Sequence, residues 1–230
     1  MRLSEYEVKT MNSKARTLLS EEMLESLGVV ANCRMNRSRD LASYRRELGL
    51  DPLSFLNRFD NPGWLDICCG EGRALITAAK QAPKVEIVGV DLAGHFRSDT
   101  PTNLAFQKAP LRGLVPNRSF QLITCVHGLH YIGDKLSALL KLAGWLADDG
   151  IFVGHFDPRS LKWEDGTSAS RRVLKWFRRN GWTYNSRRRL LKGVGLDNVD
   201  CPFEFLGADP EAGPNFTGQE AVDAYYRRIR

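Results

Sequence analysis

The sequence lacks the features of membrane proteins and of disulfide-rich secreted domains. No hydrophobic run approaches the length of a membrane span, and residues 1–18 are too polar for a signal peptide. Five cysteines form an odd set without metal-ligand spacing, which argues against a disulfide framework and a zinc site. The dinucleotide fingerprint G-x-G-x-x-G is also missing, which argues against NAD. We therefore expect a soluble, cytoplasmic protein with no metal.

What is present fits an α/β domain. The chain has 230 residues, 43% of them hydrophobic, enough for one sheet with helices on both faces. From Gly63 onward apolar strands alternate with helices, which predicts a doubly wound, mostly parallel sheet. We expect strands at Trp64–Cys68, Val85–Val90, Leu104–Lys108, Phe120–Val126 and Ile151–Phe156, followed by an antiparallel pair near Arg187–Lys192 and Phe203–Leu206.

The remaining segments show helical or turn patterns. Apolar residues at spacings of three and four predict an amphipathic helix over Lys14–Leu27. The Asp148–Asp149–Gly150 run predicts a turn before the fifth strand. Further helices are expected at Asp40–Leu48, from Asp51-Pro52, at Lys135–Leu146, at Arg171–Asn180 and at Gln219–Arg230.

The stretch Trp64–Ala74 reads as a buried strand, a glycine turn and the start of a helix. Gly70 and Gly72 stand where a Cβ would block close backbone approach or disfavour a positive φ. A helix N-terminus at the carboxyl edge of a parallel sheet offers backbone N–H groups to a nucleotide-like ligand. Asp91 ends the next apolar strand, where it can accept both ribose hydroxyls of an adenosine moiety.

This combination resembles class I S-adenosylmethionine-dependent methyltransferases over roughly residues 63–156. The resemblance implies a Rossmann-like, seven-stranded sheet with an antiparallel last strand, and S-adenosylmethionine as cofactor. It further implies an N-terminal helical lid or substrate segment at 1–61 and a cofactor-binding domain at 62–230. The first motif glycine is replaced here by Cys68, where a positive φ would be strained. The motif positions are Asp66, Cys68, Gly70 and Gly72.

The family's usual acidic residue after the third strand is absent, because the run there is Lys108-Ala109-Pro110. Adenine recognition is therefore expected from backbone groups near Lys108 and Ala109, with apolar packing from Leu92 and Pro110. The resemblance implies as cofactor-binding residues Asp66, Cys68, Gly70, Gly72, Asp91, Leu92, Ala109, Pro110 and Val126.

The segment after the fourth strand is the expected acceptor side. His127 or His130 can act as general base, although each can instead pack on the cofactor and form hydrogen bonds with the backbone. Tyr131 and Trp163 are expected to form walls of the acceptor site, and Arg37 to contact the cofactor carboxylate or an acidic acceptor. The tetrapeptides D-P-P-Y and N-P-P-Y of base-amino methyltransferases are missing, which disfavours a DNA amino-methylase.

The acceptor class stays open at the level of sequence. The favoured reading is methyl transfer to an O or N atom of a small-molecule or peptide-derived acceptor. Net charge is +6, and residues 151–192 carry eleven Lys or Arg against three acids, a balance of +8. This strip, from Arg159 to Lys192, keeps an RNA methyltransferase as an alternative. A non-catalytic binding or scaffold protein of the same fold is the other alternative.

Overall fold

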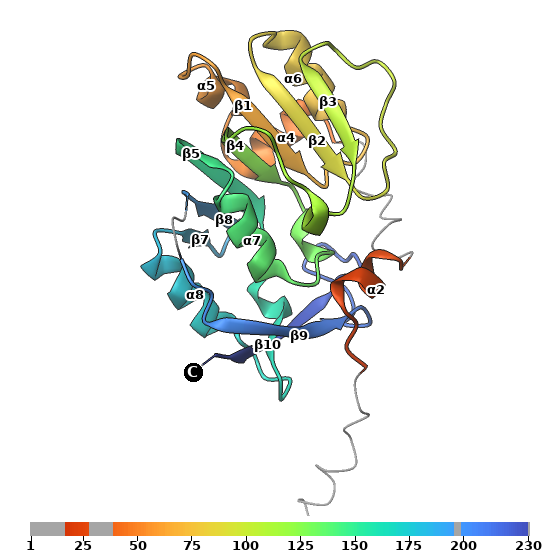
Figure 1. Cartoon of the computed structure of the whole chain (residues 1–230), viewed down its shortest axis with the longest axis vertical. Coiled ribbons are helices and arrows are strands. Elements are labelled where there is room, and N and C mark those ends of the chain that lie inside the picture. Colours follow the sequence, from red (N-terminus) through yellow and green to blue (C-terminus); the bar gives the residue numbers. More distant parts are fainter. Residues whose placement is uncertain (1–16, 28–38, 196–198, 230) are drawn as a thin grey trace, which may run out of the picture.

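The computed structural model describes residues 17–27, 39–195 and 199–229 (Figure 1). Its centre is a seven-stranded sheet with the strand order β3-β2-β1-β4-β5-β8-β7. Strands β1 to β5 are parallel, whereas β8 is antiparallel to both of its neighbours, so the predicted fold class is confirmed. The strands are β1 (Gly63–Ile67), β2 (Glu86–Asp91), β3 (Leu104–Lys108), β4 (Phe120–Cys125), β5 (Leu146–His155), β7 (Thr183–Asn185) and β8 (Leu190–Gly193).

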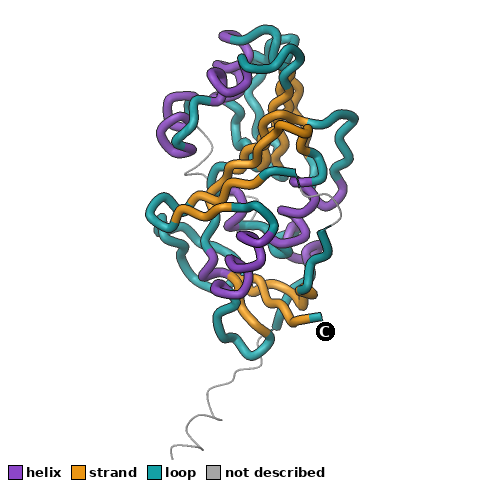
Figure 2. Tube along the Cα trace, turned by 90° about the vertical axis from the view of Figure 1, so that its left-hand side faces the viewer, coloured by secondary structure: helices purple, strands orange, loops and turns teal. Residues whose placement is uncertain are grey.

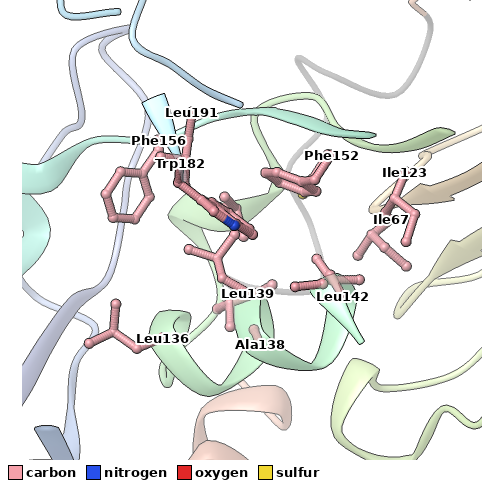
Figure 3. Packing of buried hydrophobic residues seen from close by; sticks show 14 of the residues in the cluster. Ile67, Ile123, Leu136, Ala138, Leu139, Leu142, Phe152, Phe156, Trp182 and Leu191 are labelled. Carbon is pink, nitrogen blue, oxygen red and sulfur yellow. The ribbon is translucent and has the colours of Figure 1, made fainter. Parts of the chain in front are cut away.

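Helices cover both faces of this sheet (Figure 2). On one face α4 (Leu41–Leu48), α5 (Pro52–Leu56) and α6 (Arg73–Gln81) enclose an apolar cluster around Trp64 and Leu122. On the other face, α7 (Lys135–Ala143) and α8 (Ser170–Arg179) enclose a second cluster. There Leu139 and Leu142 of α7 face Phe152 and Trp182 (Figure 3). Burial on both faces explains why β1 is apolar along most of its length.

A second sheet lies at the carboxyl ends of the main strands. It contains β6 (Leu161–Trp163), β10 (Asp223–Arg228) and β9 (Phe203–Asp209), in the order β6-β10-β9. The short helix α2 (Glu21–Glu25) lies beside β9, with Leu24 packed on Ala208 and Val222 (Figure 1). The buried Lys135 Nζ donates to the carbonyls of Ile132 and Val222, which ties the start of α7 to this sheet.

The second sheet corrects two predictions for the end of the chain. The helix expected at Gln219–Arg230 is wrong, because residues 223–228 form β10 between two partner strands. Cross-strand pairing with Ala208 and Phe205 decides this segment, since Ala224 and Tyr226 are fully buried there. Residues 203–206 likewise belong to β9 of the second sheet and not to the main sheet, whose antiparallel strands are β7 and β8.

Two element boundaries also differ from expectation. The turn predicted at Asp148–Gly150 is wrong: these residues continue β5, and a register shift opposite Phe120 absorbs them. The predicted helix Lys14–Leu27 is shorter within the described range, because Leu19 exchanges backbone hydrogen bonds with Ala208 and α2 starts only after Ser20. Among the helices of the described ranges, none has the length and apolar character needed to cross a membrane.

Candidate active site

The loop between β1 and α6 has three residues with positive φ. Gly70 and Gly72 have φ of 62° and 75°, as their predicted role requires, and Cys68 has φ of 59°. A left-handed backbone costs a non-glycine residue about 1 kcal/mol or more. The Cys68 side chain packs against Gly128, where an added Cβ would lie 2.4 Å from the Cys68 Cβ. The glycine lost from the motif loop is thus matched by a glycine in the facing loop.

Asp91 stands at the end of β2 and is held rigidly by backbone donors. Its Oδ2 accepts the Gly70 N–H at 3.0 Å, and its Oδ1 accepts the N–H groups of Ala93 at 2.9 Å and Gly94 at 3.4 Å. The carboxylate is therefore fixed between the motif loop and the loop after β2. Because the carboxylate is already held in place, no side-chain entropy is lost in ordering it when a ligand diol binds.

A cavity opens at the carboxyl ends of β1, β2, β3 and β4. Nine of the residues singled out from the sequence line it, and α2 adds two acids that the sequence patterns did not single out, Glu21 and Glu25. Among its described lining residues there is no Lys or Arg. The nine predicted residues are Cys68, Gly70, Asp91, Leu92, Ala109, Pro110, Val126, His127 and Tyr131.

Four of the other five candidates, Asp66, Gly72, His130 and Trp163, do not line the cavity. Gly72 is the N-cap of α6, and a Cβ added to it would lie 2.1 Å from the ring of Phe106. Trp163 is in β6 of the second sheet, where it packs on Phe203 and under Arg228, away from the cavity lining. Arg37 lies outside the described residues.

Asp66 is fully buried beneath the cavity and does not line it. Its carboxylate accepts hydrogen bonds from the hydroxyls of Tyr44 at 2.6 Å and Thr124 at 2.5 Å. Burial raises the pKa of Asp66 to about 7, against the opposing effect of the Thr124 and Tyr44 hydrogen bonds. The bond to Tyr44 fastens α4 to β1, so this motif residue connects the N-terminal helices to the strand that precedes the motif loop.

Asp66 predicts a pH dependence of stability. Its pKa in the folded protein, about 7, exceeds its ordinary value of 3.8, so the folded state binds the extra proton between these values. Its stabilising contribution is therefore complete below pH 3.8 and is lost as pH rises through 7. Urea unfolding at pH 5 and pH 8 should show wild type losing up to about 3 kcal/mol more than Asp66→Asn between these two pH values. Equal pH slopes for the two proteins would contradict this origin.

Three of the four histidines meet at the ends of β4 and β5. His127 follows β4, lies at φ 61° and is buried. Its Nε2 is 2.9 Å from Oε2 of Glu47, a residue of α4. The ring of His155 stacks on it with 3.8 Å between centroids. Burial lowers the pKa of His155 to about 3, so that ring is neutral at physiological pH.

Glu47 and His155 were missed by sequence reasoning. His155 ends β5 just as His127 follows β4, and adjacent parallel strands bring their carboxyl ends to one edge. The position of His155 could therefore have been predicted from the strand pattern. No sequence pattern marks Glu47, because its contact with His127 depends on how α4 packs against the sheet. Burial raises the pKa of Glu47, but the His127 hydrogen bond and the charge of Arg39 outweigh it and leave that pKa below its usual range.

The ligand atoms of Glu47, His127 and His155 lie within 4.8 Å of one another, a donor set that divalent metals use. The two imidazole planes are inclined by only 18°, so their lone pairs lie in nearly parallel planes. They do not converge on a common point as metal ligands do. Glu47 Oε1 is moreover engaged by Arg39 at 3.3 Å. The geometry favours hydrogen bonding and proton transfer over chelation.

His130 and Tyr131 follow in the turn Gly128–His130 and after it. His130 is buried and does not line the cavity; its ring stands edge-on to Phe216 at 5.2 Å. Burial lowers the pKa of His130 to about 3. The Tyr131 hydroxyl donates to Gln219 Oε1 at 2.8 Å, which joins the cavity wall to the loop after β9. Of the three clustered histidines, His127 is thus the one that lines the cavity.

Comparison with known proteins now gives the family. A family model described as a methyltransferase domain matches residues 36–199, more than half of the chain. This chain belongs to the methyltransferase domain family. The resemblance read from the motif loop and Asp91 is confirmed at the level of the family.

Individual relatives are distant. An uncharacterized methyltransferase of Mycobacterium tuberculosis is 31% identical over 94 residues, which cover 37% of this chain and 46% of that protein. The chain thus spans about half the length of the curated relatives it matches. Among solved structures, the N-methyltransferase NodS of Bradyrhizobium japonicum, in complex with S-adenosylhomocysteine, has a TM-score of 0.47 and 16% identity over 75% of this chain and 95% of that one. The amino pentose methyltransferase CalS10 of Micromonospora echinaspora has a TM-score of 0.41 and 17% identity over 67% and 57%.

Proposed function

We propose that this methyltransferase transfers a methyl group from S-adenosylmethionine to an O or N atom of a small-molecule or peptide-derived acceptor. The observation that carries the proposal is one cavity that joins the Asp91 carboxylate to the His127–Glu47 pair. One group suits an adenosine diol, and the other suits removal of a proton from an acceptor.

The residues present fit this cofactor. Asp91 can accept both ribose hydroxyls, and the apolar surfaces of Leu92, Pro110 and Ile132 suit an adenine ring. No side chain caps the N-terminus of α6, so its first N–H groups and dipole are available to a ligand carboxylate. Cys68 adds a side chain at the motif loop, but that side chain packs toward Gly128. These features support cofactor binding despite the missing motif glycine.

When bound, S-adenosylmethionine supplies a methyl group already activated on a sulfonium. The chain's own work is to align the acceptor, exclude water and take up a proton where the acceptor carries one. In the neutral His127 ring the Nε2–H donates to the Glu47 carboxylate, which leaves the lone pair on Nδ1. Nδ1 is buried without a hydrogen-bond partner in the described part of the chain. We assign it as the proton acceptor for an alcohol or ammonium.

The N-terminal segment takes part in this site, which supports its proposed role as a lid or substrate segment. Glu21 and Glu25 of α2 line the cavity, and Glu47 of α4 holds His127. Because the cavity lining carries acids and, among the residues described, no Lys or Arg, an amine fits it better than an acidic acceptor. The predicted contact of an acidic acceptor with Arg37 stays a prediction.

Calorimetric titration with S-adenosylmethionine and S-adenosylhomocysteine tests the proposal, followed by mass spectrometry of amines, alcohols and peptides incubated with the cofactor. Micromolar binding of both nucleosides and a 14-dalton gain in one acceptor class are the expected results. A folded protein that binds neither nucleoside would refute the proposal. Cofactor binding without product for any acceptor would instead favour the scaffold alternative.

The RNA alternative has one observation in its favour. A shallow cleft beside α8 is lined by Trp176, Phe203 and Ile229 and by the cations Arg172, Lys175, Arg179 and Arg228, none of which forms a salt bridge with another described residue. Cationic and aromatic side chains together suit single-stranded RNA. Fluorescence anisotropy with a labelled oligonucleotide at 50 and 200 mM salt separates the two readings, since RNA binding should weaken steeply with salt.

A further inference from the structure

The cavity has carboxylates on two different walls. Asp91 belongs to the sheet edge and is anchored on the motif loop through Gly70. Glu21 and Glu25 belong to α2, which the second sheet holds in place through Leu24. Between these walls the lining is mostly apolar. Such a slot suits a flat ring that carries hydrogen-bond donors at separate positions.

An adenosine moiety has this distribution of donors. Its ribose diol matches Asp91, and its 6-amino group needs a second acceptor. The residues after β3 supply no acidic side chain, because Ala109, Pro110 and Leu111 line that wall. Backbone groups there can contact ring nitrogens, and the carboxylates other than Asp91 that line this cavity are Glu21 and Glu25 of α2. Arg112, the next residue after Leu111, forms an ion pair with Glu25 at 2.8 Å.

The two acids of α2 differ in what they already bind. Glu21 uses both oxygens for backbone donors, Oε1 for the Gly133 N–H at 3.3 Å and Oε2 for the Asp134 N–H at 2.6 Å. Glu25 accepts from Arg112 through Oε2, and no hydrogen bond from a described residue reaches its Oε1. Its side chain is only 14% exposed, so the carboxylate is largely enclosed by the protein. Arg112 also fixes the carboxylate in place.

We infer that Glu25 accepts a hydrogen bond from the adenine 6-amino group of the bound cofactor, and that it selects adenine over a base with oxygen at this position. The inference rests on the proposed use of S-adenosylmethionine. In this chain Glu25 of the N-terminal segment would thus make the contact that the family's acidic residue after the third strand usually makes. A base with a 6-oxo group would place two acceptors against each other, which is unfavourable. Glu25 is thus a specificity residue that no sequence motif marks.

The test compares S-adenosylhomocysteine with S-inosylhomocysteine, its 6-oxo analogue, by calorimetric titration of the full chain. Wild type should bind the adenine compound at least about tenfold more tightly, as expected for a hydrogen bond to a charged group. Glu25→Ala should reduce this preference to less than about threefold, through weaker binding of the adenine compound. Its retained affinity for S-inosylhomocysteine would show that the variant is folded.

Glu22→Ala is the matched control. Glu22 lies on the same helix and also contacts Arg112, at 3.5 Å, but its side chain is 79% exposed and does not line the cavity. This variant should keep the wild-type preference. Equal losses for both ligands in Glu25→Ala, or the same loss of preference in Glu22→Ala, would overturn the inference while leaving the cofactor intact. Wild type that binds neither ligand would overturn the proposed function as well.

Discussion

Asp91→Ala is expected to weaken binding of S-adenosylhomocysteine by about 100-fold or more. Two hydroxyl donors would lose a charged acceptor, and hydrogen bonds to charged groups contribute about 1.5–3 kcal/mol each. The variant also releases the N–H groups of Gly70, Ala93 and Gly94, which the carboxylate holds in the native loop. Calorimetric titration measures the loss of affinity directly, since binding of S-adenosylhomocysteine does not require a methyl acceptor.

Asp99→Ala controls for the removal of an acid in the same region. Asp99 forms an exposed ion pair with Lys80 at 3.1 Å and does not line the cavity, so its variant should bind like wild type. Asp91→Asn should be intermediate, because an amide keeps one acceptor for Ala93 and Gly94 but turns its NH₂ toward a donor. Affinity of Asp91→Ala within threefold of wild type would mean that the diol binds elsewhere.

The positions of Gly70 and Asp91 could be predicted from sequence because they depend on the local order of strand, turn and helix. A buried parallel strand, a turn and a helix fix where Gly70 lies, and the next strand end fixes Asp91. These positions follow from the residues adjacent to them in the sequence. The alternation of strands and helices likewise sufficed for the parallel part of the sheet.

The features that could not be predicted depend on contacts between distant segments. Glu25 lines the cavity and Glu47 holds His127 because α2 and α4 pack against residues 87 and 80 positions further along the chain, Arg112 and His127. Residues 223–228 have no strong intrinsic preference that separates strand from helix; pairing on both edges of β10 decides. The helix expected at Gln219–Arg230 was wrong because Ala224 and Tyr226 are buried in a strand with partners on both sides.

His127→Asn is expected to lower kcat by about 10²–10⁴-fold for an alcohol or ammonium acceptor, the usual range for removal of a general base. Asparagine is chosen because it tolerates the left-handed backbone, φ 61°, better than most residues. Affinity for S-adenosylhomocysteine should stay within about threefold, since the ligand diol is held by Asp91. His95→Ala, at the other histidine of the cavity wall, should leave kcat unchanged.

Glu47→Gln separates proton transfer by His127 from simple packing. The amide keeps the shape of the side chain but removes the charge that fixes the Nε2–H tautomer and stabilises the protonated ring, so kcat should fall by about tenfold or more. KM for the acceptor should change little, because Glu47 lies behind His127 and not in the cavity lining. An acceptor already deprotonated at neutral pH, such as a thiolate, should be methylated by both variants at near wild-type rates. If His127→Asn methylates an alcohol acceptor as fast as wild type, the ring is a wall of the site, and positioning alone accounts for the rate.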